Sequence, residues 1–185
     1  QGLCIPPKVA PVQVVVIVVK EDDRTVSAAS ALTDSLSYAG IRARLDIRTD
    51  QGFGRRATEW ELKGVPLRVE VGPRDLERDE FTVRRRDTQQ KFTVARDAVV
   101  TTLRELLDTI HAEMFSAAHE RLGQHVADVA TPAEAVDAAA TGFARIPWRV
   151  LGEAGERQLN AHAITVRCLQ TADGGLPDVD TPDGE

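Results

Sequence analysis

The chain has 185 residues, of which 42% are hydrophobic and 28% charged, a composition that fits a folded globular protein and excludes a disordered one. Its longest apolar run, residues 12–19, is too short to cross a bilayer, which takes about 20 residues. No basic segment precedes an apolar core near the start, so we expect neither a signal peptide nor a membrane partner. The two cysteines, Cys4 and Cys168, form no CxxC pair and predict no disulfide framework, which favours the cytoplasm.

The formal net charge of −6 argues against a protein that binds nucleic acid through phosphate attraction alone. The charge is uneven, however. Residues 42–96 contain 14 basic and 10 acidic side chains, a local net charge of +4, so the remaining residues carry −10. A mildly basic segment inside an acidic chain suits a local contact with RNA better than a sequence-independent grip on phosphates.

Strand and helix patterns alternate over the first two thirds of the chain. Residues 13–19 are apolar on both faces, which predicts a central strand covered on both sides by helices. The order of the elements predicts an α/β domain with a mixed five-stranded sheet flanked by helices, ending near residue 123. The predicted strands are 13–19, 42–48, 65–71, 81–86 and 91–94, the predicted helices are 25–39, 58–63 and 97–122, and residues 50–55 are a predicted loop.

A second, smaller α/β unit follows. Thr131-Pro132-Ala133-Glu134 has the cap, the first-turn proline and the glutamate of a helix start. We therefore predict a domain at residues 1–123, a small C-terminal domain at 124–170 and an acidic flexible tail at 171–185. Within the second domain the predicted helices are 131–141 and 153–162, and the predicted strands are 143–149 and 164–169.

The segment from Glu59 to Glu77, EWELKGVPLRVEVGPRDLE, resembles the signature of prolyl-tRNA synthetases of the archaeal and eukaryotic-like group. The opening Gly2–Val14, GLCIPPKVAPVQV, resembles the segment that leaves the catalytic core of that family. The resemblance covers essentially the whole chain and weakens after about Thr141. It implies the class II synthetase anticodon-binding fold, followed by the small C-terminal domain of the family.

The resemblance also sets expectations for activity. The family joins proline to tRNA with ATP and magnesium, in a catalytic domain whose motifs do not occur in this chain. We therefore expect the chain alone to be non-catalytic and to carry no cofactor. Its ends are expected to be fragment boundaries, since the terminal Tyr of the family is missing. The expected partners are the tRNA(Pro) anticodon loop and the parent catalytic domain, with a homodimeric parent enzyme and a monomeric fragment.

Proline anticodons contain two consecutive guanines. A guanine presents acceptors that suit Arg or Lys and donors that suit a carboxylate, so a reading face should carry both charges. The residues alone leave an alternative open for the Arg68 and Glu70 alternation, namely a solvated strand face with ion pairs. The resemblance implies that Glu61, Arg68, Arg74 and Lys91 read the guanines, and we add Arg56 and Lys63 as neighbouring RNA-binding candidates.

The chain departs from the family pattern in two further places. The family shows PGxKFxEWE before this signature, whereas residues 53–61 read FGRRATEWE, so Ala57 replaces an aromatic residue that can stack on a base. We hypothesise that Phe53 or Arg55 supplies this stack. Many relatives bind zinc through four cysteines in the small domain, but only Cys168 lies there. The histidines lack zinc-site spacing, so we predict no zinc: His111, His119, His125 and His162.

Several alternatives stay open at this stage. An anticodon domain of a threonyl, histidyl or glycyl synthetase would share the fold. An accessory or interaction protein could keep the fold and no longer read tRNA. A hydrolase lacks support, because no Ser-His-Asp or Cys-His set is recognisable. Trp60 is interpreted as core filling or as a stacking group, and the basic run Arg84–Arg86 as a solvated strand edge or a phosphate contact.

Overall fold

The computed structural model describes residues 2–171 and 175, and the chain divides into two compact units. Unit 1 comprises residues 1–116 and unit 2 residues 117–185. The division falls inside helix α4, Val99–Gln124, whereas the sequence analysis places it at residue 123. Of the predicted tail 171–185, all but residues 171 and 175 lie outside the described residues.

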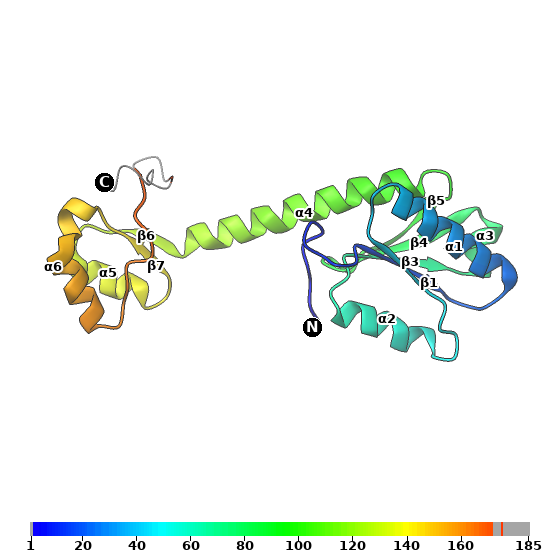
Figure 1. The fold of residues 1–185 in the computed structure, drawn as a ribbon, viewed down its shortest axis with the longest axis horizontal. Helices are drawn as coiled ribbons and strands as arrows, with labels where there is room; N and C mark the ends of the chain where they lie inside the picture. The colour runs from blue at the N-terminus through cyan, green and yellow to red at the C-terminus, as the bar shows by residue number, and fades with distance from the viewer. Residues whose placement is uncertain (1, 172–174, 176–185) are drawn as a thin grey trace. The chain divides into compact units, whose positions relative to one another are not determined.

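Unit 1 is built on a five-stranded sheet of order β2-β1-β3-β4-β5 (Figure 1). Strand β1 runs parallel to both β2 and β3, and the β3-β4-β5 part is antiparallel. The predicted mixed five-stranded sheet is therefore confirmed. The strands are β1 Val14–Val18, β2 Ala43–Asp46, β3 Leu67–Val71, β4 Glu80–Arg85 and β5 Lys91–Ala95.

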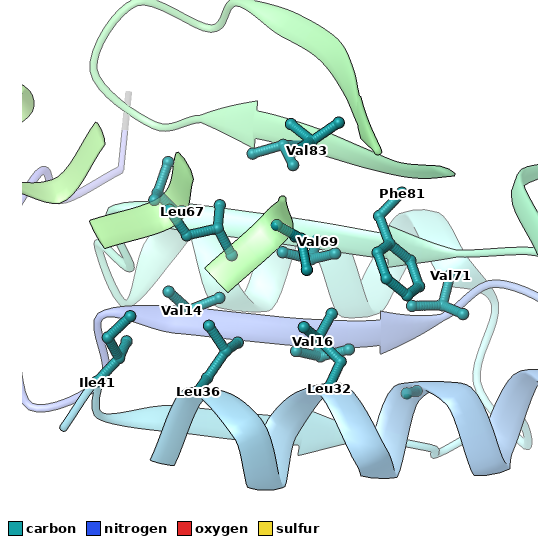
Figure 2. Close-up of a cluster of buried hydrophobic side chains, with 14 of the residues drawn as sticks. Val14, Val16, Leu32, Leu36, Ile41, Leu67, Val69, Val71, Phe81 and Val83 are labelled. Carbon is teal, nitrogen blue, oxygen red and sulfur yellow. The ribbon is translucent and has the colours of Figure 1, made fainter. Parts of the chain in front are cut away.

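Strand β1 is buried on both faces, as its apolar run predicts. Val14 and Val16 face α1, Asp23–Tyr38, where Leu32 and Leu36 pack against them (Figure 2). The start of α4 covers the same face, with four buried side chains in this core. Val15 and Ile17 face the other way, toward α2, Phe53–Leu62. Helices therefore lie on both faces of the sheet at strand β1, which is second in the strand order.

Two elements of unit 1 differ from the predictions. Helix α2 begins at Phe53 instead of residue 58, because Phe53 and Trp60 pack one helix face against the sheet although Gly52 and Gly54 suggest a loop. Helix α3, Pro73–Glu77, was not predicted. Its signals are a proline in the first turn and Asp75, which accepts a hydrogen bond from the amide of Gly72 at 3.1 Å.

Unit 2 contains α5, Pro132–Ala139, α6, Trp148–Ala161, and the parallel strands β6, Val126–Asp128, and β7, Phe143–Arg145. The predicted capping box is present, since Thr131 accepts from the Glu134 amide and Glu134 accepts from the Thr131 amide. The strand predicted at 164–169 is wrong, because these described residues pair with no strand. Ile164 and Val166 pack against the unit 2 core. The alternation of apolar and polar residues in this segment therefore reflects side-chain burial and not pairing with another strand. Over the described residues, no helix is both long and apolar enough to cross a membrane.

A buried ion pair ties α2 to the sheet. Arg56 is 1% exposed and Asp46 2% exposed, and Arg56 Nη1 lies 3.3 Å from Asp46 Oδ1. Arg56 also donates to the carbonyl oxygens of Val18 at 2.8 Å and Gln51 at 3.1 Å. The prediction that Arg56 binds RNA is therefore not supported by its position, because the protein interior takes up its donors and leaves no surface for a ligand.

Asp46 is the acceptor at the centre of this arrangement. Trp60 Nε1 donates to its Oδ2 at 2.7 Å, and Arg48 donates to both of its oxygens. Burial by itself would raise the pKa of Asp46, but the hydrogen bonds from Arg48, Trp60 and Arg56 outweigh it and hold this pKa well below its usual range. Trp60 is therefore a packing and anchoring residue, with its indole nitrogen engaged inside the unit.

We expect Leu36→Ala to lower the free energy of unfolding of unit 1 by about 3 kcal/mol, because it leaves a cavity in the core. Leu36 is 0% exposed, whereas Tyr38 on the same helix is 98% exposed, so Tyr38→Ala is the matched control and should change little. Urea unfolding followed by Trp60 fluorescence, in a Trp148→Phe background, measures unit 1. Equal effects of the two substitutions would contradict this assignment of the core.

The second prediction concerns the buried pair. Arg56→Met removes one partner of a buried carboxylate and should cost about 3 kcal/mol of unfolding free energy, with exposed Arg44→Met as the control.

The pKa of Asp46 lies below 3.8, its ordinary value, in the folded chain, so its ionised form stabilises the fold at neutral pH. This stabilisation should be lost as the pH falls below about 4. Asp46→Asn should therefore flatten the acid limb of the stability profile, and parallel profiles would refute the role of Asp46.

Candidate functional site

Three basic side chains form a row across β3, β4 and β5. In the strand register Arg68 lies opposite Arg84, and Arg84 lies opposite Lys91. Residues directly opposite one another share a face of the sheet. Arg68 is also in register with Val15, so the row lies on the α2 side of the sheet.

Two members of the row, Arg68 and Lys91, are joined to two carboxylates. Arg68 Nη1 lies 2.8 Å from Glu61 Oε1, and its Nη2 lies 3.0 Å from Glu70 Oε1. Lys91 Nζ lies 3.1 Å from the other oxygen of Glu70. We call these four residues, Glu61, Arg68, Glu70 and Lys91, the charged network. It alternates in sign from the end of α2 across three neighbouring strands to β5.

Exposure changes along the charged network. Arg68 and Glu70 are 7% and 6% exposed, so the alternative is wrong about solvation of this strand face, although the ion pairs that it expected are present. The side chains at the two ends are more accessible, at 33% for Glu61 and 57% for Lys91. A ligand would therefore meet a carboxylate and an ammonium first, both held by a buried pair behind them.

The other predicted residues lie outside the charged network. Lys63 is exposed, and its Nζ lies 4.3 Å from the ring centroid of Trp60, a cation–π geometry. Arg74 is exposed on α3, beyond the end of β3. Arg56 is buried, as described above. The structure thus brings Glu61, Arg68 and Lys91 together, with Glu70 as a member that the sequence analysis did not include among the site residues.

A small hollow adjoins the charged network, and Trp60, Glu61, Arg68, Arg84, Arg85 and Arg86 contribute to its lining. Arg86 Nε donates to the carbonyl oxygens of Leu3 at 3.1 Å and Glu61 at 3.2 Å, so it fixes the N-terminal segment. Arg85 pairs with Asp87 and Glu113, and these hydrogen bonds, led by that to Asp87, raise its pKa. Among the described residues, the side chain of Arg84 has only the amide of Gln89 as a hydrogen-bond partner, with Nη2 at 2.8 Å from Gln89 Oε1.

The two stacking candidates are placed differently. The ring centroid of Phe53 lies 5.8 Å from the guanidinium carbon of Arg68, and its ring packs against the core of Val15 and Ile17. Arg55 is 76% exposed and lies 3.6 Å from Glu59. Ala57, at the position of the family aromatic, is 6% exposed. Phe53 is therefore the candidate that adjoins the charged network.

The absence of a zinc site stays a prediction. In residues 2–171 and 175, no three or more His, Cys, Asp or Glu side chains lie close enough together to hold an ion. Within the same range both cysteines are free thiols, with Cys4 half-buried and Cys168 exposed. Burial, the largest influence, raises the pKa of Cys4. The expected absence of zinc is compatible with these positions but not tested by them.

Comparisons with known proteins assign the fold to a family. The model of the anticodon binding domain matches residues 13–106. The chain is 47% identical over 177 residues to a proline–tRNA ligase of Frankia casuarinae, covering 96% of this chain and 38% of the relative. It is 40% identical over 174 residues to that of Thermococcus kodakarensis, covering 90% of this chain and 36% of the relative.

The solved structures agree. Prolyl-tRNA synthetase from Cryptosporidium parvum, complexed with L-proline and AMP, superimposes with a TM-score of 0.78 at 28% identity, over 88% of this chain and 36% of that one. The chain thus spans little more than a third of the length of these relatives. The resemblance drawn from the EWELKGVP segment is confirmed, and the chain belongs to the family of anticodon binding domains, of the kind found in proline–tRNA ligases.

Proposed function

We propose that this chain recognises the anticodon of tRNA(Pro) as the non-catalytic part of a proline–tRNA ligase. The observation that carries the proposal is the charged network, which offers an accessible acceptor at one end and an accessible donor at the other. The relatives are proline–tRNA ligases, and this chain covers 38% of the first of them. Joining proline to tRNA with ATP and magnesium would belong to a catalytic domain outside the sequence described here.

The chemistry of guanine fits the ends of the charged network. Its N7 and O6 acceptors suit the Lys91 ammonium, and its N1–H and N2–H donors suit the Glu61 carboxylate. Arg68 holds Glu61 with one nitrogen and Glu70 with others, and Glu70 holds Lys91. Arg68 is thus a positioning residue in this arrangement. Side chains ordered before binding lose less conformational entropy when the RNA docks.

The exposed cations outside the charged network extend the proposed surface. Lys63 lies over Trp60, and Arg74 lies exposed on α3. Both could donate to a base edge or to the loop backbone, since single-stranded RNA loops present both. We propose them as secondary contacts, and we leave Arg56 out because it is 1% exposed.

Two observations favour a second candidate function. Ala57 provides no aromatic ring, and the cations of the charged network are already paired inside the protein. Both features would suit an accessory or interaction protein that keeps the fold and no longer reads tRNA. For the leading proposal we place the parent enzyme in the cytoplasm as a homodimer. We propose that the isolated chain is a monomer, and sedimentation analysis would test this oligomeric state.

We expect the chain to prefer a proline anticodon stem-loop by about tenfold over a loop in which both guanines are replaced, since a good base-edge contact discriminates by about 1–3 kcal/mol. Lys91→Ala should remove most of this preference and leave the fold intact, because Lys91 is 57% exposed at its side chain. Arg74→Ala should weaken binding. Arg44→Ala, at the opposite edge of the sheet, is the control. Equal binding of both loops by the wild type would favour the accessory function.

The stacking hypothesis gives a separate prediction. Phe53→Leu keeps apolar volume in the core and removes the ring, so it should weaken binding to either loop by about tenfold, as expected for the loss of one stacked base. Arg55→Ala should have little effect, since Arg55 already pairs with Glu59. Fluorescence anisotropy with a labelled stem-loop measures both variants. Unchanged affinity in both would show that neither residue replaces the missing aromatic.

A further inference from the structure

Arg84 lies in the middle of the row of three cations and differs from its neighbours. Glu70 neutralises both of them, at 3.0 Å from Arg68 and 3.1 Å from Lys91. Over residues 2–171 and 175, no carboxylate lies within ion-pair distance of Arg84. Like charges directly opposite one another destabilise a sheet. No ion pair within the described residues therefore accounts for a basic residue at this position.

The hydrogen bonds of Arg84 are also incomplete. Its Nη2 donates to Gln89 Oε1 at 2.8 Å, but its Nε is buried and finds no acceptor in the described part of the chain. A guanidinium carries five donors, and a buried donor without an acceptor costs about 1–3 kcal/mol. Gln89 is itself anchored, because its Nε2 donates to the carbonyl oxygen of Arg86 at 2.7 Å. A neutral amide occupies one donor but leaves the charge of Arg84 uncompensated.

Arg84 lines a small hollow with three other arginines and one carboxylate. The hollow that it lines with Glu61 and Arg68 also receives Arg86, whose recorded side-chain hydrogen bonds go to two carbonyl oxygens. Glu61 is already bonded to Arg68. Arg84 therefore contributes a positive charge that no carboxylate of the described residues neutralises. Guanidinium groups bind phosphate oxygens in a two-pronged geometry, which makes arginine suited to phosphodiesters.

We propose that Arg84 binds a backbone phosphate of the RNA loop whose bases meet Glu61 and Lys91. The inference rests on the proposed function, since it places an RNA loop on this face. Neighbouring strands lie about 4.8 Å apart, so Arg84 is one strand away from Lys91, and a base at Lys91 brings its own phosphodiester near Arg84. Phosphate contacts fix the orientation of the nucleic acid, and base contacts give specificity. Arg84 thus sets the register in which the charged network meets the bases.

The test compares the complete chain with Arg84→Gln on two stem-loops, the proline anticodon loop and the loop with both guanines replaced, over about 50 to 200 mM salt. The variant should bind both loops about tenfold more weakly, as expected for the loss of a charge-assisted hydrogen bond. The slope of log affinity against log salt should become shallower by about 0.7, the value for one phosphate of a single strand. The guanine preference should not change, and Arg84→Lys should keep the wild-type slope.

Two controls separate this role from a structural one. Arg44→Gln removes an exposed charge at the opposite edge of the sheet and should leave affinity and slope unchanged. Arg84→Gln should not lower the urea midpoint of unit 1, because it relieves repulsion between opposed cations. A neutral methylphosphonate at the contacted loop position should weaken the wild type and have no further effect on Arg84→Gln.

The outcomes distinguish this proposal from the proposed function. An unchanged salt slope in Arg84→Gln would overturn the phosphate contact, as would a loss confined to the guanine loop. Wild-type chain that binds both loops equally would overturn anticodon reading, while the Arg84→Gln comparison would still decide the phosphate contact. A chain that binds neither loop would overturn both.

Discussion

The buried guanidinium of Arg68 is the constraint on which the functional face depends. A charge that is 7% exposed is costly unless opposite charges and hydrogen-bond acceptors surround it. Glu61 and Glu70 meet this requirement, and they come from the end of α2 and from β3 itself. The pairing therefore fixes the end of α2 relative to β3. Through the second oxygen of Glu70 it also orders Lys91 on β5.

Two buried arginines lie on the α2 side of the sheet, and they have different consequences. Arg56 pairs with Asp46, which is 2% exposed, so this arrangement is closed to ligands and serves the fold. Arg68 pairs with Glu61, whose side chain is 33% exposed, so the same kind of pairing reaches the surface. The difference lies in the exposure of the partner and not in the arginine. A buried ion pair can thus orient a group that meets a ligand.

The sequence predicts the parts of the fold that short-range pattern determines. The apolar run of β1 and the spacing of apolar residues in α1 follow the period of a buried strand and of a helix with one buried face. The start of α2 could not be predicted, because Gly52 and Gly54 have loop propensity and only packing of Phe53 against the sheet overrides it. Helix α3 has five residues, too few to show a period.

The candidate site was predictable to a similar degree. Alternation places Arg68 and Glu70 on one strand face, and the family resemblance adds Glu61 and Lys91. That Glu70 joins these residues depends on the register of β3, β4 and β5, which no local pattern specifies. The burial of Arg56 is a tertiary property too, because Arg56 lies on helix α2 and its partner Asp46 lies on strand β2. The sequence alone therefore does not distinguish the fully enclosed Arg56 from Arg68, whose ion pair reaches the surface.

The charge balance of the face explains how an acidic chain can be suited to RNA. Most affinity for nucleic acid comes from phosphate contacts, which require uncompensated cations. In the charged network the two cations are matched by two carboxylates, so it offers directional donors and acceptors with little net attraction for phosphate. Such a surface favours discrimination between bases over general affinity. On such a surface a single uncompensated cation within the row has a large effect on RNA binding. One fixed positive charge can orient the loop, and it does not add the many phosphate contacts that would hold any RNA equally well.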